Sequence, residues 1–338
     1  MATIYEVSAL AGVSLSSVSR VLNDHEHVSE KTKKKVMAAM AELEYRPNSV
    51  ARSLASSRSD SIGVLVSELH GPFFGDMLSS IELALRNAGK HAVITAGHSD
   101  EESEKEGLDF LIDRNCDALI LLVDAMSDDD LITLSRKKIP FVILNRNIPE
   151  IRGNCFYLDN ELGGYLAAKH LIECGHKDIA YISGPLSKQD STERFTGHKK
   201  ALIEAKIPFN KALFYEGDYL TQSGRDGIND FIKNKVLFTA VACANDEMAS
   251  GAMRGARDNN IDIPSDCSII GFDNAYFTEY LFPQLSTINN PIKAMAKMST
   301  QWILKNVYKQ KDLDIKNLFS PELIKRESVV KVLAGIKK

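Results

Sequence analysis

The pattern of hydrophobic and polar positions at the start of the chain predicts two short helices joined by a tight turn. Thr3 and Glu6 have the spacing of a capping box, in which each side chain bonds the other residue's backbone N–H, so the first helix should begin there. Gly12 supplies the turn, and Ser14 is placed to cap the second helix. This arrangement is typical of a helix-turn-helix unit, although an ordinary amphipathic helical hairpin would share it.

The second predicted helix separates two kinds of side chain. Val18, Val21 and Leu22 fall on its inward face, and the opposite face carries Leu15, Ser16, Ser17 and Arg20. A first exposed turn that is short and polar, followed by an arginine, suits insertion into a DNA major groove. A third helix is predicted to start at Ser29, with an apolar stripe of Val36, Met37, Met40 and Leu43.

From residue 61 the pattern changes to short apolar runs that alternate with amphipathic helical stretches. Two series of candidate strands follow each other, at 62–67, 91–96, 117–123 and 140–145, and then at 178–183, 212–217, 240–245 and 268–273. Nearly continuous apolar strands between helices indicate parallel sheets that are covered on both faces. The expected fold class is therefore α/β, with two doubly wound lobes in tandem. Ligands of such sheets bind beyond the carboxyl ends of the strands.

Polar side chains follow several of these strands. Asn145, Asn245 and Asp273 each come at a strand end, and Arg194 lies in the helical stretch after the 178–183 strand. The aromatic residues Phe73, Phe74 and Tyr219 occupy similar positions, and Leu69 lies beside them in the sequence. Charged and amide groups around aromatic faces suit a sugar, whose hydroxyls take hydrogen bonds and whose C–H faces stack on rings. Asp246 could equally cap the helix that it precedes.

Composition excludes several classes of protein. The chain has 338 residues, of which 44% are hydrophobic and 25% charged, so two or three globular domains are expected. No run of 18 apolar residues or export signal is present, which predicts neither a membrane span nor secretion. The five scattered cysteines form no C-x-x-C pair, so we expect free thiols in a reducing cytoplasm and no metal site. Without a G-x-G-x-x-G or G-x-x-x-x-G-K-[ST] motif, the sequence also argues against a nucleotide-dependent enzyme.

The formal net charge of −4 gives no bulk attraction to DNA. Residues 1–60 hold eight Lys/Arg against seven Asp/Glu, so a DNA-binding unit there would rely on where its cations are placed. The candidate cations are Arg20, Lys31, Lys33 to Lys35, Arg46, Arg52 and Arg58.

The residues after the third predicted helix resemble a known family in detail. The run Y-R-P-N-S-V-A-R-S-L-A-S-S-R-S-D-S-I-G-V, at 45–64, resembles the headpiece and hinge of the lactose/galactose repressor family (LacI/GalR), and the likeness continues to the C-terminus. It is most similar to the galactose-type repressors, in F-T-A-V-A-C-A-N-D-E-M-A-S-G-A-M at 238–253 and L-F-S-P-E-L-I-K-R-E-S-V at 318–329. The resemblance implies a helix-turn-helix headpiece and a periplasmic-binding-protein-like core.

The resemblance also implies a domain plan and a set of DNA contacts. It places the headpiece at 1–46, the hinge at 47–60, one effector-binding lobe at 61–159 with 289–320, and the other at 160–288 with 321–338. Contacts to bases or to the DNA backbone are implied for Ile4, Tyr5, Ser14, Leu15, Ser16, Ser19, Arg20, Asn23, His27, Ser29, Thr32, Tyr45, Asn48, Ala51 and Leu54. In relatives two short hinge helices pair in the minor groove, and the residue matching Leu54 wedges between base pairs. A flexible Ser/Arg-rich linker would fit the free protein equally well.

For the core, the resemblance implies that Arg194 and Asp273 hold the hydroxyls of an effector. Asn145 and Tyr219 match a polar and a stacking position in relatives, whereas Phe74 and Leu69 could belong to the core. Asn274 departs from the family's G-F-D-D pattern. The expectation is a cytoplasmic, nucleoid-associated homodimeric repressor that a small sugar releases from operator DNA, without a cofactor, with galactose or a galactoside as first choice. A β-glucoside effector, a corepressor and, more distantly, a sugar-binding transport protein are the alternatives.

Overall fold

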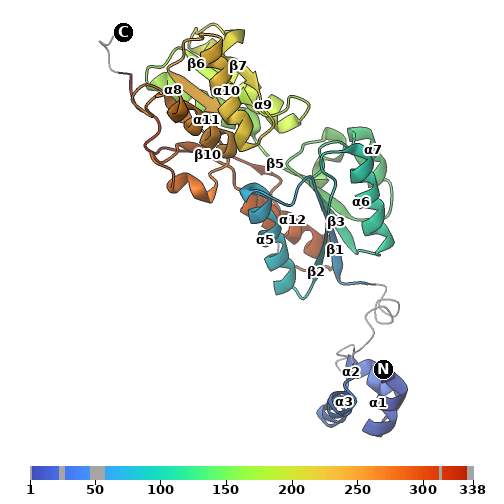
Figure 1. The fold of residues 1–338 in the computed structure, drawn as a ribbon. Coiled ribbons are helices and arrows are strands. Elements are labelled where there is room, and N and C mark those ends of the chain that lie inside the picture. The colour runs from blue at the N-terminus through green and yellow to red at the C-terminus, as the bar shows by residue number, and fades with distance from the viewer. Residues whose placement is uncertain (1, 23–26, 46–57, 312–313, 333–338) are drawn as a thin grey trace. The chain divides into compact units, whose positions relative to one another are not determined.

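The structure is a computed structural model that describes residues 2–22, 27–45, 58–311 and 314–332. The chain forms two compact units, residues 1–61 and residues 62–338 (Figure 1). Each unit is described by itself below.

The described residues of the N-terminal unit form three helices: α1 (Ile4–Ala11), α2 (Leu15–Leu22) and α3 (Glu30–Glu42). Both bonds of the predicted capping box are present at α1, and Gly12 has the left-handed φ of 60° that ends this helix. The predicted caps are also confirmed at Ser14, whose Oγ accepts from the N–H of Ser17, and at Ser29. The buried core is formed by Val7, Ala11, Val18, Val21, Val36 and Ala39.

One position of the predicted α3 stripe is wrong. Met37 is 53% exposed, and Ala39 points into the core instead. Ala39 lies three residues after Val36 and therefore shares its helix face, whereas Met37, one residue after Val36, does not.

The larger unit contains two lobes, which we define by their sheets. The N-lobe has six strands in the order β11-β5-β4-β3-β1-β2. Their bounds are β1 (Ser61–Val66), β2 (His91–Ala96), β3 (Ala118–Leu121), β4 (Phe141–Leu144), β5 (Cys155–Leu158) and β11 (Leu318–Phe319). Its helices are α5 (Pro72–Asn87), α6 (Glu101–Asp113), α7 (Asp128–Ser135), the 3-10 helix η1 (Pro149–Asn154) and α12 (Ile292–Asn306).

Alternate residues of the central N-lobe strands face different helices. Val64 and Ile120 pack in one apolar cluster with residues of α5 and α12, whereas Leu65 and Leu119 pack in another with residues of α6 and α7. The sheet is therefore covered on both faces, as its nearly continuous apolar strands predict.

The C-lobe has a four-stranded sheet in the order β7-β6-β8-β9. Its strands are β6 (Ile179–Ser183), β7 (Phe214–Glu216), β8 (Ala240–Cys243) and β9 (Ser268–Ile270), all parallel. Its helices are α8 (Asn160–Glu173), α9 (Gln189–Glu204), α10 (Thr221–Lys233) and α11 (Asp246–Asp258), with the 3-10 helices η2 (Lys211–Leu213) and η3 (Tyr276–Glu279). Successive residues of β6 face opposite layers, because Tyr181 stacks on Phe195 of α9 while Ile182 lies against Gly227 of α10.

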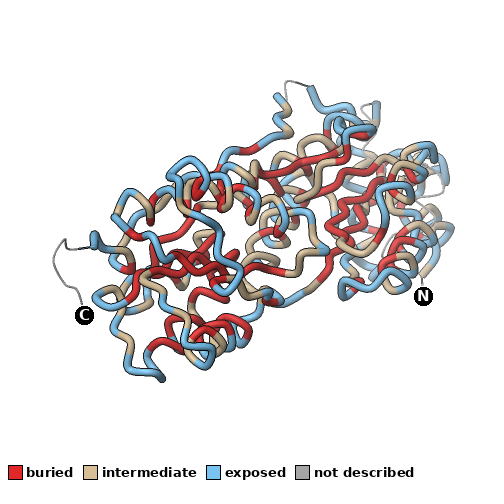
Figure 2. Tube along the Cα trace, turned by 90° about the horizontal axis from the view of Figure 1, so that it is seen from above, coloured by how far each residue is buried: buried red, intermediate tan, exposed pale blue. Residues whose placement is uncertain are grey.

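The chain passes between the lobes at 158–160, 289–292 and 319–322. β10 (Thr287–Asn289) and β12 (Glu322–Ile324) pair antiparallel in two of these passages. The buried segments run through the interiors of both lobes, and the exposed ones form the outer loops and helix faces (Figure 2). No helix among the residues that the structure describes is long and apolar enough to cross a membrane.

All eight predicted strands are present, with trimmed ends, and the two parallel sheets confirm the predicted fold class. The pattern missed β5, β10, β11 and β12. These strands have two to four residues each, as short as several strands that were predicted. The exact domain boundaries given above remain predictions.

Candidate functional site

The first candidate site is the exposed face of α2. Leu15, Ser16 and Arg20 are exposed there, opposite the buried Val18 and Val21. The Ser14 Oγ lies 2.8 Å from the hydroxyl of Ser16 and fixes the first turn. The face therefore presents a small apolar group, a hydroxyl and a guanidinium, which are groups that read thymine methyls and base-edge acceptors in a major groove.

The other headpiece positions predicted to contact DNA lie at the ends and outer faces of the helices. Tyr5 is 70% exposed, which is unusual for an aromatic residue of a small helical unit. The hydroxyls of Ser29 and Thr32 lie 2.9 Å apart at the start of α3, and Ile4, Ser19 and Tyr45 are partly buried. His27 is exposed. Asn23, Asn48, Ala51 and Leu54 lie outside the described residues.

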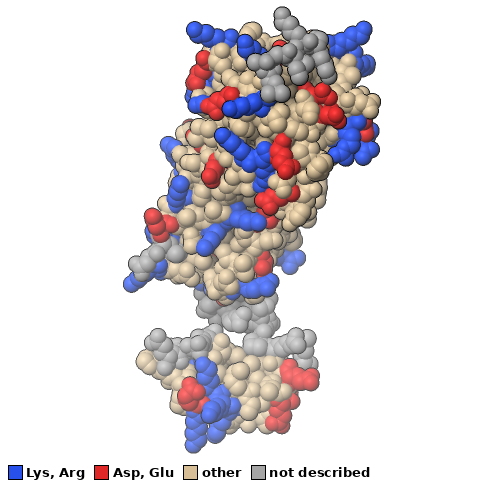
Figure 3. All heavy atoms as spheres, turned by 90° about the vertical axis from the view of Figure 1, so that its left-hand side faces the viewer, with Lys and Arg blue, Asp and Glu red and all other residues tan. Residues whose placement is uncertain are grey.

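Charge is unevenly distributed on the headpiece. On the face shown in Figure 3, basic side chains gather toward one edge of the N-terminal unit, with acidic atoms among them, and further acidic side chains lie toward the other edge. On the larger unit, both signs are interspersed. Because the headpiece is nearly neutral overall, it can attract DNA only where its cations are grouped locally.

The second candidate site is a cavity of about 550 Å³ between the two lobes. It lies beyond the carboxyl ends of β1, β4, β6, β8 and β9, where a doubly wound fold binds ligands. Seven of the eight residues proposed from the sequence line it, namely Phe73, Phe74, Asn145, Arg194, Tyr219, Asn245 and Asp273. Leu69 is the exception, since it is 55% exposed and is not among the lining residues.

Arg194 of α9 is the central cation of this cavity. Its side chain is 3% exposed; Nε donates to the Asn160 Oδ1 at 2.9 Å, and NH1 donates to the Ala244 carbonyl at 2.6 Å. The guanidinium lies 3.8 Å from the ring centroid of Phe272, which is a cation–π contact. These contacts fix the plane of the guanidinium at the floor of the cavity.

Two carboxylates flank Arg194 without forming hydrogen bonds to it. Asp190 lies 3.7 Å from NH2, and Asp273 lies 3.8 Å from NH1. Burial by itself lowers the pKa of Arg194, but the neighbouring Tyr219, Asp273 and Asp190 raise it overall, so the guanidinium stays charged. The result is a row of alternating charge in which each group keeps hydrogen-bonding capacity for a ligand.

Asp273 has an unusual backbone and an unusual titration. Its φ is 111°, in the region that glycine favours, and its Oδ1 accepts from the Asn290 amide at 3.1 Å. Burial raises its pKa to about 6, although Arg194 and the Asn290 hydrogen bond oppose the shift. Near neutral pH the group is therefore a carboxylate that accepts hydrogen bonds.

Asn245 positions Tyr219 in the cavity wall. The Asn245 amide donates to the Tyr219 carbonyl at 2.8 Å, while its Oδ1 caps α11 by accepting from Met248. Both polar ends of Asn245 are thus occupied. Tyr219 itself has a φ of 73°, and its ring packs so closely over Gly184 that no side chain fits beneath it.

The opposite wall is apolar. α5 begins at Pro72, and the rings of Phe73 and Phe74 meet edge to face at 5.3 Å between centroids. Leu122 and Ile292 extend this wall. The N-lobe therefore adds an aromatic surface to the cavity, besides the charged side chains of Asp76, Asp124 and Lys293.

Among the buried side-chain atoms without a hydrogen-bond partner in the described part of the chain, two are amide oxygens of residues that line the cavity. The Asn145 amide nitrogen donates to Asp190 at 3.1 Å, and the Asn290 amide nitrogen donates to Asp273, which leaves the Oδ1 of each side chain unpaired. A buried acceptor without a donor costs about 1–3 kcal/mol. Both residues line the cavity, so a ligand hydroxyl is the natural donor.

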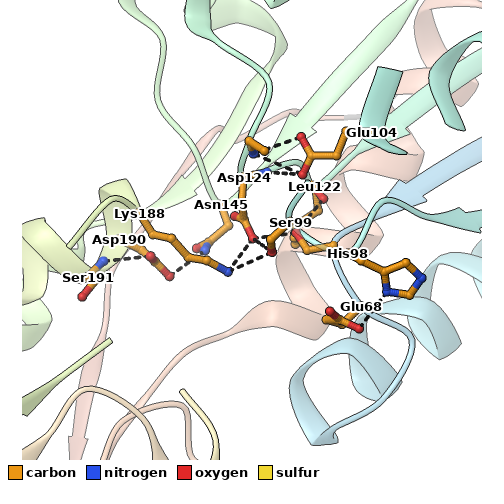
Figure 4. A network of polar contacts seen from close by, with 12 residues as sticks. Glu68, His98, Ser99, Glu104, Leu122, Asp124, Asn145, Lys188, Asp190 and Ser191 are labelled. Atoms are coloured by element: carbon orange, nitrogen blue, oxygen red, sulfur yellow. Dashed lines mark hydrogen bonds and ion pairs between the residues drawn. The ribbon is translucent and has the colours of Figure 1, made fainter. Parts of the chain in front are cut away.

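Sequence reasoning missed several lining residues, among them Asp124, Lys188, Asp190, Glu247 and Asn290. Asp190 had a detectable signal, because it precedes Arg194 by one helical turn. Asp124 and Lys188 had none: they come from different lobes and meet at 2.7 Å only in the folded protein (Figure 4). Asp246 is buried and accepts from Ala275 and Thr287, so it joins structural segments besides lining the cavity.

No group of three or more His, Cys, Asp or Glu side chains able to hold a metal ion occurs among the residues that the structure describes. The five cysteines are free thiols.

Comparison with known proteins places this geometry in a family. Residues 3–48 match the family model described as bacterial regulatory proteins, lacI family, and residues 168–329 match the periplasmic binding protein-like domain. The chain is 36% identical to the transcriptional regulator GalR of Escherichia coli K12 over 97% of this chain and 96% of that protein. It is 34% identical to the repressor PurR of Actinobacillus pleuropneumoniae, over 97% and 98%.

A solved structure gives the same result for the fold. The lac repressor dimer, crystallised bound to operator and the anti-inducer ONPF, is 30% identical and has a TM-score of 0.87, covering 97% of this chain and 99% of that one. The family consists of transcriptional regulators and not of enzymes. The chain belongs to the lacI family and is a DNA-binding transcriptional repressor.

Proposed function

We propose that a small sugar, bound between the lobes, releases this repressor from its operator, with galactose or a galactoside as first choice. The observation that carries the proposal is the Arg194 guanidinium held between Asp190 and Asp273 at 3.7 and 3.8 Å. A hydroxyl group both donates and accepts, so vicinal hydroxyls can bridge a carboxylate and a guanidinium at once. The similarity to GalR supports galactose over other sugars.

The rest of the cavity suits the same class of ligand. The unpaired Oδ1 atoms of Asn145 and Asn290 each need a donor, which a further hydroxyl supplies. Phe73 and Phe74 give the apolar surface on which the C–H face of a sugar ring packs. Asn245 and Tyr219 complete the wall between these regions.

On the DNA side, we propose that Leu15, Ser16 and Arg20 read base edges in the major groove. Ile4, Tyr5, Ser14, Ser19, Asn23, His27, Ser29, Thr32, Tyr45 and Asn48 contribute further contacts, and Ala51 and Leu54 act in the hinge. Two copies form a homodimer in the cytoplasm, so that two headpieces meet a palindromic site. Effector binding shifts the equilibrium between two arrangements of the lobes by its differential affinity for them.

A corepressor is the second candidate, because PurR relatives are almost as similar as GalR. A β-glucoside is a further one, since a regulator solved with cellobiose, CelR, is 28% identical over 97% of this chain. The flanking carboxylates favour a polyhydroxylated ligand over a purine, whose flat ring offers few hydroxyl donors.

Substitution of Arg194 tests the proposal. Arg194→Ala should abolish release of a labelled operator by sugar while leaving operator affinity within about threefold of the wild type. Arg254→Ala is the matched control, because Arg254 is 65% exposed and pairs with Asp258 on its own helix. If Arg194→Ala keeps both operator binding and sugar release, the effector site lies elsewhere.

A further inference from the structure

Acidic side chains dominate the lining of the cavity. Eight carboxyl side chains and three Lys or Arg side chains line it within the part of the chain that the structure describes. Burial raises the pKa of Asp246 well above its usual range and that of Glu247 in the same direction, so burial favours the neutral form of both carboxyls. The remaining carboxylates still outnumber the cations.

Each cation is already neutralised by an acidic neighbour. Arg194 lies between Asp190 and Asp273, Lys188 contacts Asp124 at 2.7 Å, and Lys293 of α12 contacts Asp76 of α5 at 3.1 Å. A ligand that brought a negative charge into this cavity would find no cation without a competing carboxylate.

The pair between Lys188 and Asp124 is the best formed of these. Its side chains are only 23% and 22% exposed, so water and salt screen it less than a surface pair. Lys188 is also the N-cap residue of α9, where a cation meets the positive end of the helix dipole. The charge of Lys188 therefore destabilises α9 by itself, and the ion pair with Asp124 offsets this effect.

Asp124 is held in place by its own lobe. Its Oδ2 accepts from the hydroxyls of Ser67 and Ser99 at 2.7 and 3.1 Å, and Lys188 reaches the same oxygen from the C-lobe (Figure 4). The fully buried Glu104 carboxylate accepts from the backbone N–H groups of residues 124–126, which fixes the loop that carries Asp124. A preorganised carboxylate of this kind competes strongly with any anionic group for Lys188.

We propose that Asp124 is a specificity-determining residue, which occupies Lys188 so that the cavity accepts uncharged sugars and rejects phosphorylated ones. This inference rests on the sugar effector proposed above and adds the charge of the ligand to it. Asp76 acts on Lys293 in the same way, but its effect is smaller because this pair is more exposed, at 35% and 66% of the two side chains.

The test compares sugars that differ only by a phosphate. Binding of D-galactose, galactose 1-phosphate and galactose 6-phosphate to the full-length protein is measured by calorimetry at fixed salt, and the same is done with glucose and its phosphates. The wild type should bind the neutral sugar at least tenfold more tightly than either phosphate. Asp124→Asn keeps the size of the side chain and frees Lys188, so it should reduce this preference at least tenfold. Asp76→Asn should change it less than threefold.

The control is Asp226→Asn, because Asp226 accepts from Gln222 on the surface of α10. The specificity claim is overturned if the wild type binds a sugar phosphate as tightly as the neutral sugar, or if Asp124→Asn leaves the preference unchanged while neutral sugar still binds. If the wild type binds none of these sugars but still binds operator, galactose as the effector is refuted, and the selectivity claim fails with it.

Discussion

Several residues with an unusual backbone conformation line the cavity. Asn145, Tyr219, Asp273 and Asn274 all have positive φ, at 59°, 73°, 111° and 56°, and all four line the cavity. Such conformations cost of order 1–3 kcal/mol each and persist where surrounding contacts enforce them. Here the contacts are visible, because Asn245 holds the Tyr219 carbonyl and Arg326 donates to the Oδ1 of Asn274. The side chains of these four residues therefore line the same cavity.

Gly184 permits the position of Tyr219. A Cβ atom on Gly184 would lie 2.3 Å from the Tyr219 Cζ, so Gly184→Ala must displace the ring. We expect at least a tenfold loss of effector affinity, measured by calorimetry, with operator affinity unchanged. Gly153→Ala is the control, since no atom lies within 4 Å of the added Cβ there. Unaltered effector affinity in Gly184→Ala would show that the ring of Tyr219 is not part of the site.

His198 makes stability depend on pH. It is buried against Tyr181, neither ring nitrogen has a hydrogen-bond partner among the described residues, and burial lowers its pKa to about 3. In the unfolded chain, His198 binds a proton at its ordinary pKa of about 6.5, whereas in the folded protein it stays neutral down to a much lower pH. The contribution of His198 to stability is therefore complete above pH 6.5. The contribution should fall by roughly 1.4 kcal/mol per pH unit between about 6.5 and 3.

His198→Phe should remove that slope and leave stability at pH 7 equal or greater. Urea unfolding of both proteins at pH 7 and pH 5 measures the difference. Burial also lowers the pKa values of His170 and His176. These two histidines contribute equally to the pH dependence of both proteins. An equal pH dependence in the two proteins would contradict the assignment to His198.

At the scale of elements, close helix contacts depend on glycine. A Cβ on Gly197 of α9 would lie 1.9 Å from the Glu161 carbonyl of α8, and one on Gly164 of α8 would lie 1.9 Å from the Arg194 carbonyl. Gly163 faces the ring of Phe272 in the same region. The pair of glycines at 163–164 therefore serves packing, as its position in a helical stretch predicts, and it brings α9 with Arg194 into place.

Gly197→Ala should separate α8 from α9. The clash is with backbone, which cannot rotate away, so we expect a loss of about 1–3 kcal/mol or more in the free energy of unfolding. Gly75→Ala, in α5, is the opposite case: nothing lies within 4 Å of its Cβ, so helix propensity should stabilise the protein by up to about 1 kcal/mol. Urea denaturation measures both, and equal effects of the two variants would be inconsistent with the helix contact.

The elements also show what sequence patterns can and cannot predict. Caps at Thr3 and Ser29 and eight of the ten strands in the two parallel sheets were predictable, because each depends on local spacing or on a continuous apolar run. The placement of Arg194 and Asp273 in one site followed from the family resemblance, because Arg194 lies in a helix and not at a strand end. The pair between Lys188 and Asp124 could not be predicted, because it depends on how closely two separate lobes approach.

At the scale of the whole molecule, the two units have different roles. The headpiece supplies an exposed reading face on a core of only a few small apolar residues. The larger unit supplies a cavity whose walls come from both lobes, so a ligand there contacts both and can change how they close. An effector with equal affinity for both arrangements would change nothing, however tightly it bound.

The most direct test of this account is fluorescence anisotropy with a labelled palindromic operator that has a central C-G step. The protein is titrated onto the operator, and D-galactose is then added, followed by a panel of glycosides and purines. We predict tight, salt-sensitive binding that galactose reverses. Operator binding that no sugar of the panel weakens, or that a purine strengthens, would contradict release by a sugar effector.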